Sequence, residues 1–521
     1  MLISDIVFRQ ARHSPDRLAL VCDDTELTFA QLADRVGRLA SYLRGVTQSG
    51  DRVALLAENC PEYVECYYGV PLAGCGLTFL NYRLADEELR HLVRTTAPTV
   101  LLVQHRYLGI AEQLQADRLA AGGDLRVVVL DGIRSTGAHV GYEDCLSRTT
   151  GTEPARPVAS GDLAWLLYTS GTTGLPKGAM LTHRSIMGAV FNSALSWGHS
   201  PDGGLLFPWP LYHVAGYAVL VSHLRGDAVH VLRRFDAGRV LELIGSRRLT
   251  ELTIAPTMLA MLLAHPDAAD ADLSSLRTVY YGSAHMPVET LLAAMDRLPT
   301  VSYRTGFGMT ELSGLAVYLS DDDHRRAADG DEDLLRCVGR PMPTTEIRVV
   351  DDEGTDVRGD DVGEVVVRGD QVTEHYWTAD GPVPARDAEG WFHTGDLGRW
   401  RGDVLRIVDR RKDMIITGGE NVYAHDVEEV LYTHPAVAEA AVIGLPDPLW
   451  GEAVTAVVQL RPGLEADEDE LVAHCRARLA GYKRPRRVVF ADRLPLNPSG
   501  KILKRVLREQ LSSATDPKGR P

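Results

Sequence analysis

The residues best suited to chemistry lie in one glycine-rich segment, YTSGTTGLPKGAMLTHRS, at positions 168–185. Glycines let backbone N–H groups turn toward an anion without a clash from Cβ, hydroxyl side chains add donors, and a lysine adds a mobile cation. A surface turn has no need for so many phosphate-competent groups, so the segment predicts a triphosphate or pyrophosphate site. Pro176 stands where a Walker A loop requires glycine, which excludes that loop. The residues concerned are Thr169, Ser170, Gly171, Thr172, Thr173, Gly174 and Lys177.

Two later motifs each carry a carboxylate. TGFGMTEL at 305–312 contains Glu311, and WFHTGDLG at 391–398 contains Asp396. Taken alone, the first motif could mark a helix start and the second a turn. Their occurrence in the same chain as the glycine-rich segment makes these purely structural explanations less favoured.

Further motifs follow along the chain, namely PLYHVAGY at 210–217, YYGSAHMP at 280–287, DRRKDMIITGGENVY at 409–423 and LNPSGKILKRVL at 496–507. This series resembles the signatures of the adenylate-forming superfamily, which contains acyl-CoA synthetases, luciferases and nonribosomal adenylation domains. The resemblance covers nearly the whole chain. It implies that ATP activates a carboxylic acid as an acyl-adenylate, whose acyl group then passes to coenzyme A, with Mg²⁺ as metal cofactor.

The resemblance also implies roles for individual residues. Lys501 would catalyse adenylate formation, Thr310 would bind the α-phosphate, Glu311 would hold Mg²⁺ and His213 would lie beside the substrate carboxylate. Lys412 would be the pivot of a mobile C-terminal domain. The coenzyme A contacts would be Gly418, Gly419 and Lys483. Besides the glycine-rich segment, the ATP- and AMP-binding residues would be Gly282, Ser283, Ala284, Gly306, Phe307, Gly308, Asp396 and Arg410.

The chain departs from the superfamily pattern at a few of these positions. Phe307 stands where tyrosine is usual, so it can stack on adenine but lacks the hydroxyl contact. Asp409 stands where glycine is frequent. His375 and Ala424 also differ from the common residues, and the sequence gives no physical reason for either.

The expected acyl pocket is small and apolar, which favours an aliphatic or aromatic acid over a dicarboxylate. Its lining would include Val214, Ala215, Gly216 and Met309. Amino-acid-activating relatives place an aspartate where Val214 stands, and a buried ammonium without a partner is costly, so an α-amino acid is not expected. We therefore expect an acyl-CoA ligase for a fatty or other hydrophobic acid, acids of secondary metabolism included. The alternatives are an acyl-AMP ligase that feeds a carrier protein, an enzyme that performs only the thioester-forming half-reaction, and a luciferase-like oxygenase.

Composition narrows the class of protein further. The formal net charge of −16 argues against nucleic acid or an anionic membrane surface as a partner. The seven cysteines form no CxxC pair, which favours a reducing, cytoplasmic location over a disulfide framework or zinc site. The apolar segment 205–224 contains two prolines and two histidines, so we expect it to be buried rather than to span a membrane. We expect a monomer or a homodimer.

The elements that must position these residues read as alternating strands and helices. Apolar residues at spacings of three and four predict a helix from Phe29, with Thr28 as its N-cap. Short apolar runs predict buried strands of mainly parallel sheets. The segment 323–334 is too polar for a core, and 347–369 predicts two strands of an antiparallel unit. The runs read as buried strands are 53–56, 99–103, 126–130, 163–169, 228–232 and 277–282.

A chain of 521 residues is too long for one ordinary core and predicts at least two domains. We expect an α/β protein whose large N-terminal domain, 1–410, combines layered α/β sheets with a β subdomain and binds ATP and the acid. A small mobile α/β domain, 411–521, would carry Lys501 and the two glycines. It would contain helices at 427–431 and 502–510, strands at 438–445 and 453–460, and a disordered tail after residue 513.

Overall fold

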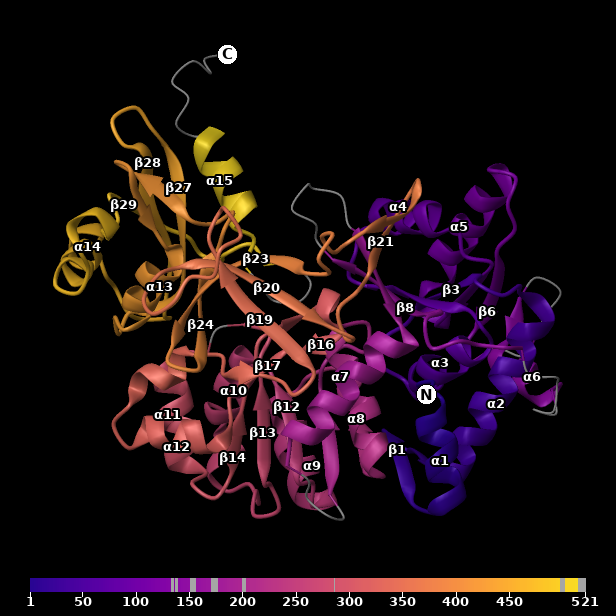
Figure 1. Ribbon diagram of the computed structural model, residues 1–521. Coiled ribbons are helices and arrows are strands. Elements are labelled where there is room, and N and C mark those ends of the chain that lie inside the picture. The colour runs from indigo at the N-terminus through magenta and orange to yellow at the C-terminus, as the bar shows by residue number, and fades with distance from the viewer. Residues whose placement is uncertain are drawn as a thin grey trace. The chain divides into compact units, whose positions relative to one another are not determined.

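The computed structural model describes residues 1–132, 135, 139–149, 156–169, 177–198, 203–284, 286–496 and 502–513. The chain divides into two compact units (Figure 1). The first holds residues 1–286, 290–347 and 367–392, and the second holds 287–289, 348–366 and 393–521. Residues 393–410 therefore group with the C-terminal part, and the domain boundary expected after residue 410 stays a prediction.

One sheet of the first unit is parallel through its middle and antiparallel at one edge. Its central strands are apolar on both faces because helices cover both sides, as the sequence runs predicted. The chain enters and leaves the glycine-rich segment through the antiparallel pair β8–β9. In spatial order the strands are β22 (Gly381–Pro384), β21 (His375–Thr378), β9 (Lys177–Thr182), β8 (Leu163–Thr169), β4 (Gly76–Leu80), β3 (Arg52–Leu56), β5 (Val100–Val103), β6 (Arg126–Val129) and β7 (Val140–Gly141).

A second sheet of this unit is parallel except for its β1–β2 edge. The carboxyl end of β13 leads into the predicted motif at 280–287, so this sheet edge presents that motif. In spatial order the strands are β14 (Ser302–Arg304), β13 (Thr278–Tyr281), β12 (Glu251–Ile254), β10 (Gly204–Phe207), β11 (Ala228–Val231), β1 (Leu18–Cys22) and β2 (Thr25–Thr28).

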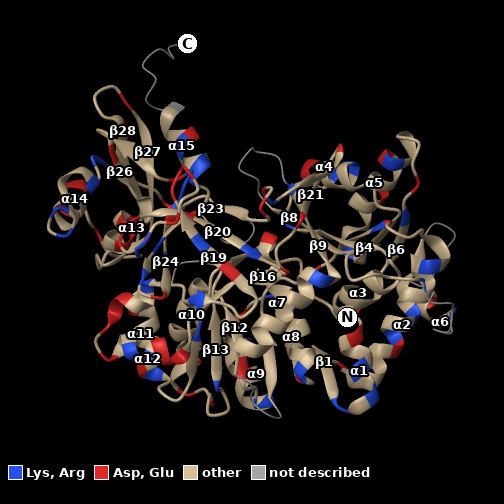
Figure 2. Ribbon diagram, in the orientation of Figure 1, with Lys and Arg blue, Asp and Glu red and all other residues tan. Residues whose placement is uncertain are grey.

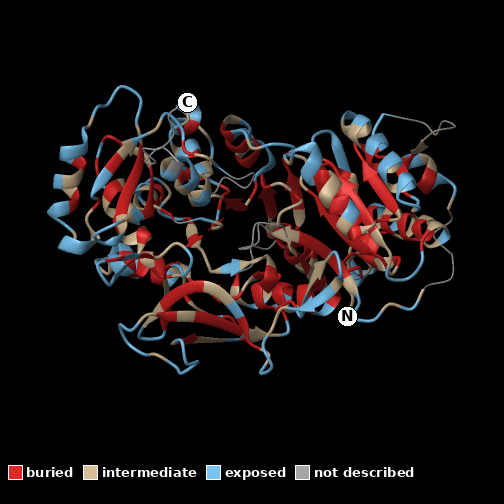
Figure 3. Ribbon diagram, turned by 90° about the horizontal axis from the view of Figure 1, so that it is seen from above, coloured by how far each residue is buried: buried red, intermediate tan, exposed pale blue. Residues whose placement is uncertain are grey.

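Helices pack on these sheets and bury the strands, as Figure 3 shows. Helix α2 begins as predicted: the Thr28 hydroxyl accepts from the Gln31 backbone N–H, and the Gln31 side chain accepts from that of Thr28. The unit's helices are α1 (Asp5–His13), α2 (Phe29–Val46), α3 (Pro61–Leu72), α4 (Asp86–Thr96), α5 (Leu108–Ala120), α6 (Tyr142–Ser147), α7 (His183–Ser196), α8 (Tyr217–Arg225), α9 (Ala237–Arg247), α10 (Pro256–Leu263), α11 (Val288–Arg297) and α12 (Asp321–Ala328). Two short antiparallel pairs join β15 (Gly308–Met309) to β16 (Gly314–Leu315) and β17 (Val317–Tyr318) to β18 (Arg340–Pro341), the second with α12 between its strands.

One expectation about the core is wrong. The segment 323–334 begins inside α12, where His324 and Asp323 are buried. Tyr281 and His324 share a hydrogen bond of 2.7 Å, and Arg340 donates to Asp323 at 2.8 Å. Polar side chains enter the core here because each has a partner, which composition alone does not reveal.

The second unit contains two sheets and three helices among its described elements. The strands and helices predicted from residue 427 onward are confirmed, and residues 514–521 lie outside the described part. One sheet orders β19 (Thr345–Val350), β20 (Gly363–Gly369), β23 (Phe392–Arg401) and β24 (Val404–Arg410). The other contains β26 (Glu420–Val422), β25 (Ile415–Thr417), β28 (Gly451–Leu460), β27 (Val437–Asp447) and β29 (Arg487–Phe490), with helices α13 (Ala424–Tyr432), α14 (Glu468–Arg476) and α15 (Lys504–Ser513).

No helix in the described ranges has the length and apolar character needed to cross a bilayer. The segment 205–224 forms most of β10, a short turn and most of α8, all largely buried, as expected. Figure 2 shows acidic and basic residues interspersed along the ribbon of both units.

Candidate active site

Glu311 lies where three distant segments of the first unit meet. It occupies a 3-10 turn directly after β15 and is 9% exposed. Its Oε1 accepts hydrogen bonds from the Thr169 hydroxyl at the end of β8, at 3.2 Å, and from the Tyr376 hydroxyl on β21, at 3.0 Å. The Thr373 N–H donates to the Glu311 carbonyl at 2.7 Å. The structure thus joins two predicted site residues and adds Tyr376, which the sequence did not single out.

Lys177 lies at the same edge. It opposes Thr169 across the β8–β9 pair, and its Nζ is 5.5 Å from the centre of the Tyr376 ring. The glycine-rich loop therefore begins and ends beside Glu311. The loop residues themselves, Ser170, Gly171, Thr172, Thr173 and Gly174, lie outside the described residues.

The surroundings of Glu311 fit a Mg²⁺ site completed by phosphate oxygens. Within the described residues no cationic side chain forms an ion pair with this buried carboxylate, and both hydroxyl donors use the same oxygen. Burial, followed by the charge of Glu311, raises the pKa of Tyr376, so Tyr376 remains a donor at neutral pH. The described part of the chain holds no cluster of three or more His, Cys, Asp or Glu side chains able to bind a metal. One carboxylate plus substrate phosphates is a usual way to hold Mg²⁺.

The two glycines of the motif at 305–312 are required by packing. A Cβ on Gly306 would lie 2.2 Å from the carbonyl oxygen of Val317, and a Cβ on Gly308 would lie 2.1 Å from that of Gly314. The carbonyl of Phe307, between them, accepts from the backbone N–H groups of Ala316 and Val317. Close packing of the two glycines and these bonds hold the backbone around Phe307.

Gly282, Ser283 and Ala284 follow the carboxyl end of β13. Ser283 has φ +72°, in the left-handed region, so the chain turns sharply there. A Cβ added to Gly282 would meet no atom within 4 Å, so this glycine faces open space. The arrangement agrees with a wall beside a substrate, the role that the resemblance implies.

His213 begins the 3-10 turn Val214–Gly216. Its Nδ1 accepts from the Ala215 N–H at 3.1 Å, and its ring stacks on Trp209 at 5.8 Å. Val214 is buried, and a Cβ on Gly216 would lie 2.0 Å from the Tyr67 hydroxyl oxygen. His213 is thus held by its own turn, and Met309 is partly buried on β15.

In the second unit, Asp396 and Arg410 face each other on β23 and β24. The Arg410 Nε lies 3.4 Å from Asp396 Oδ1, and their side chains are 46% and 8% exposed. The carboxylate can accept hydrogen bonds from a diol and the neighbouring guanidinium can donate to its oxygens, which suits a ribose. Asp409, the departure next to Arg410, is buried and accepts from the backbone N–H groups of Arg410 and His425. Asp409 therefore links the end of β24 to the first turn of α13.

The residues expected at the hinge and at coenzyme A lie in exposed turns. Gly418 and Gly419 have φ +61° and +83°, and the Gly418 N–H donates to the Trp450 carbonyl at 2.8 Å. Partial desolvation, followed by the charge of Arg410, lowers the pKa of Lys412. Lys501 lies outside the described residues.

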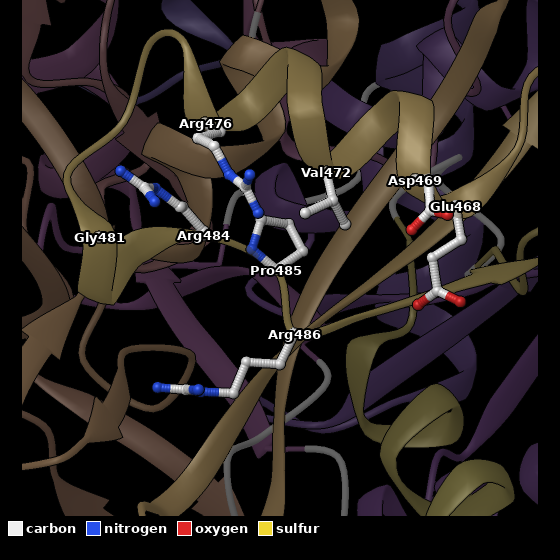
Figure 4. A pocket seen from close by; sticks show the side chains of 8 residues that line it. All are labelled: Glu468, Asp469, Val472, Arg476, Gly481, Arg484, Pro485 and Arg486. Atoms are coloured by element: carbon white, nitrogen blue, oxygen red, sulfur yellow. The ribbon is translucent and has the colours of Figure 1, made fainter.

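Lys483 is paired with Asp426 and precedes a segment that lines a pocket with three arginines and two carboxylates. Its Nζ is 2.7 Å from Asp426 Oδ2. The neighbouring segment and α14 form a surface pocket of about 430 Å³ (Figure 4). Arg486 also covers the Trp450 ring at 4.0 Å. The pocket is lined by Glu468, Asp469, Val472, Arg476, Gly481, Arg484, Pro485 and Arg486.

Comparison with known proteins agrees with this arrangement. The AMP-binding enzyme family matches residues 7–377, and the AMP-binding enzyme C-terminal domain matches 426–501. A feruloyl-CoA synthase of Amycolatopsis sp is 39% identical over 96% of this chain and 97% of that enzyme. The fatty acid–[acyl-carrier-protein] ligase ScoC of Streptomyces coeruleorubidus is 32% identical over 96% of this chain and 94% of its own length.

A solved structure supports the fold as well. The ATP-bound crystal structure of MatB from Rhodopseudomonas palustris is 30% identical, with a TM-score of 0.86 over 99% of this chain and all of that one. This confirms the predicted α/β class with a large N-terminal and a smaller C-terminal part. The chain therefore belongs to the AMP-binding enzyme family, as an AMP-forming acid–thiol ligase.

Proposed function

We propose that the chain is an ATP-dependent acyl-CoA ligase for a hydrophobic carboxylic acid. The observation that carries this proposal is the buried carboxylate of Glu311, which is held by Thr169, where the glycine-rich loop begins, and by Tyr376 on the neighbouring strand β21. The relatives named for feruloyl-CoA and for fatty acids support an acid with an aryl or alkyl body.

In the first half-reaction, a carboxylate oxygen of the acid attacks the α-phosphorus of ATP and pyrophosphate leaves. The protein needs to position the reactants and stabilise growing negative charge, without a covalent intermediate. Bound Mg²⁺ would neutralise charge on the phosphates, with Glu311 as its protein ligand. Lys177 and Lys501 would add positive charge, and Asp396 with Arg410 would hold the ribose.

In the second half-reaction, the coenzyme A thiol attacks the carbonyl carbon of the adenylate and AMP leaves. Gly418 and Gly419 lack side chains and would let the pantetheine arm approach the backbone closely. A rotation about Lys412 would replace Lys501 by these glycines between the two steps. All seven cysteines are buried free thiols, which supports the cytoplasmic location that we propose.

A carrier protein is the second candidate acceptor, because one relative is named as an acyl-carrier-protein ligase. A chain that performs only thioester formation is a third possibility. The set of Lys177, Glu311 and Asp396 favours complete adenylation over this half-reaction alone.

Pyrophosphate release tests the proposal. Purified protein is given ATP, Mg²⁺ and a panel of fatty and aryl acids, with and without coenzyme A. We expect release that depends on the acid and turns over only when coenzyme A is present. Release that requires a carrier protein instead would favour the second candidate. No release with any acid, together with thioester formation from supplied acyl-adenylate, would contradict adenylation by this chain.

A further inference from the structure

A buried polar cluster lies on one face of the second sheet of the first unit. Thr253 on β12 lies beside Tyr280 on β13 in a parallel register, so both side chains point to the same face. Glu251, two residues before Thr253, also points there. Tyr281 points to the opposite face, where it bonds to His324.

The ends of helices α7 and α8 cover this face. The Trp197 ring, just after α7, lies 4.4 Å from the Tyr280 ring. Arg225, the last residue of α8, lies 6.0 Å from the Trp197 ring and bonds to Glu251 at 3.1 Å. One aromatic pair and one ion pair are thus packed together.

Several buried polar groups of this cluster have no hydrogen-bond partner. Among the described residues, these groups are the Trp197 Nε1, the Arg225 Nε and Nη2, and the hydroxyls of Tyr280 and Thr253. Trp197 and Tyr280 are each 7% exposed, as is the side chain of Arg225. The three nitrogens can only donate, and buried donors are nearly always paired, so the cluster indicates a missing acceptor.

The charged side chains around Tyr280 are mainly positive. Arg225 and Arg304 both face Tyr280 and oppose the rise in its pKa that burial causes, while Glu251 adds to that rise. Arg304 donates to the Tyr318 hydroxyl at 2.7 Å, which leaves its charge unneutralised by that contact. Two guanidinium groups against one carboxylate favour a partner with negative or partially negative oxygen.

The cluster adjoins the segments expected to line the acyl pocket. Tyr280 and Gly282 project to the same side of β13, about 7 Å apart along the strand. Gly282 faces open space, and the Trp197 ring is 5.9 Å from Tyr217, the residue after Gly216. An acid whose carboxylate is near His213 could therefore extend toward the unpaired donors.

We propose that Trp197, Arg225 and Tyr280 form a specificity subsite that donates hydrogen bonds to an oxygen at the far end of the acid. This inference rests on the proposed ligase function and narrows it: the preferred acid has a hydrophobic body and a distal ketone or hydroxyl oxygen. A site built to donate hydrogen bonds rejects the analogue that lacks the acceptor far more strongly than an apolar pocket rejects a small change in size.

Matched acids test the subsite. Pairs are built on acids that the pyrophosphate panel shows to be substrates, for example 3-phenylpropanoic against 3-(4-hydroxyphenyl)propanoic acid and octanoic against 7-oxooctanoic acid. Octanedioic acid tests whether a carboxylate is the preferred oxygen. We expect kcat/KM to favour the oxygenated member of at least one pair by about tenfold or more.

The variants Tyr280→Phe and Trp197→Phe should each reduce that preference by about fivefold or more. Tyr281→Phe is the matched control, because it removes a tyrosine hydroxyl from the opposite face of the same strand, and its preference should equal that of the wild type. Equal kcat/KM within every pair, or an unchanged preference in both variants, would overturn the subsite. Activity toward the plain acids would still report the ligase function, so the two ideas fail separately.

Discussion

The candidate residues of the two units differ in how firmly the fold holds them. In the first unit, Glu311 is buried, bonded to two hydroxyls and preceded by glycines packed against neighbouring backbone. In the second unit, Lys412, Gly418 and Gly419 lie in exposed turns. The difference indicates that the fold fixes the carboxylate proposed to hold Mg²⁺, while the residues proposed for the thiol step lie in exposed turns with fewer contacts. It predicts that the two half-reactions respond to different perturbations.

Removing Mg²⁺ with a chelator should separate the half-reactions most strongly. Pyrophosphate release should fall by more than about 10²-fold, because Glu311 provides carboxylate oxygens but no positive charge for the phosphates. Thioester formation from supplied acyl-adenylate should change by less than about twofold. Restoring Mg²⁺ is the control. An equal fall in both assays would place the metal outside the phosphate site.

The variant Lys501→Ala should lower adenylation by about 10²–10³, the usual loss when one preorganised charge donor is removed. Thioester formation from supplied acyl-adenylate should persist. Adenylation is measured by pyrophosphate release and thioester formation by AMP release. Lys504→Ala is unsuitable as a control because Lys504 pairs with Glu428 at 2.7 Å. Arg505→Ala, on an exposed side chain of the same helix, serves instead. Equal loss in both half-reactions would remove the argument for two arrangements.

The variant Gly418→Ala should show the opposite pattern. Its backbone has φ +61°, and the new Cβ would lie 2.9 Å from the Trp450 ring, so the turn must shift. We expect thioester formation to fall by about tenfold while adenylation stays within about twofold, measured in the same two assays. Gly463→Ala, at another positive-φ turn with open space around it, is the control for backbone strain. A selective loss of adenylation would reverse the assignment of this turn.

The smallest effect concerns the two faces of β13. Tyr281→Phe leaves the Nε2 of buried His324 without its partner and should lower the free energy of unfolding by about 1–2 kcal/mol. Tyr280→Phe removes a hydroxyl that has no partner in the described residues, and it should change the free energy of unfolding by less than about 0.5 kcal/mol. Urea unfolding of both variants measures the difference. A larger loss at Tyr280 would mean that its hydroxyl is already satisfied in the free protein.

Local sequence signals predicted much of the fold. The cap at Thr28 and the apolar spacing after it place α2, and the run 163–169 coincides with β8. These two predictions succeed because the hydrogen bonds and apolar contacts that define each element join residues close together in the sequence. The structure also joins Thr169 to Glu311 by a hydrogen bond and pairs Thr169 with Lys177, while the roles of these residues stay predictions.

Contacts between residues that are far apart in the chain were not predicted from the sequence. Tyr376 bonds to a carboxylate 65 residues away, and a tyrosine beside a histidine carries no sign of that role. The Trp450 ring likewise packs against Gly418 and lies under the Arg486 guanidinium, and neither contact could be predicted from the sequence. Asp323 and His324 were excluded from the core because their partners, Arg340 and Tyr281, belong to other elements. In each case the partner decides the role, and only the tertiary structure supplies the partner.

Isotope transfer tests the central claim most directly. An acid labelled with ¹⁸O at both carboxylate positions is incubated with the protein, ATP, Mg²⁺ and coenzyme A. The masses of AMP and of the thioester are then measured by mass spectrometry. Attack of the carboxylate on the α-phosphorus predicts AMP with one ¹⁸O and a thioester that retains the other. Unlabelled AMP, or ADP with labelled phosphate, would contradict activation through an acyl-adenylate.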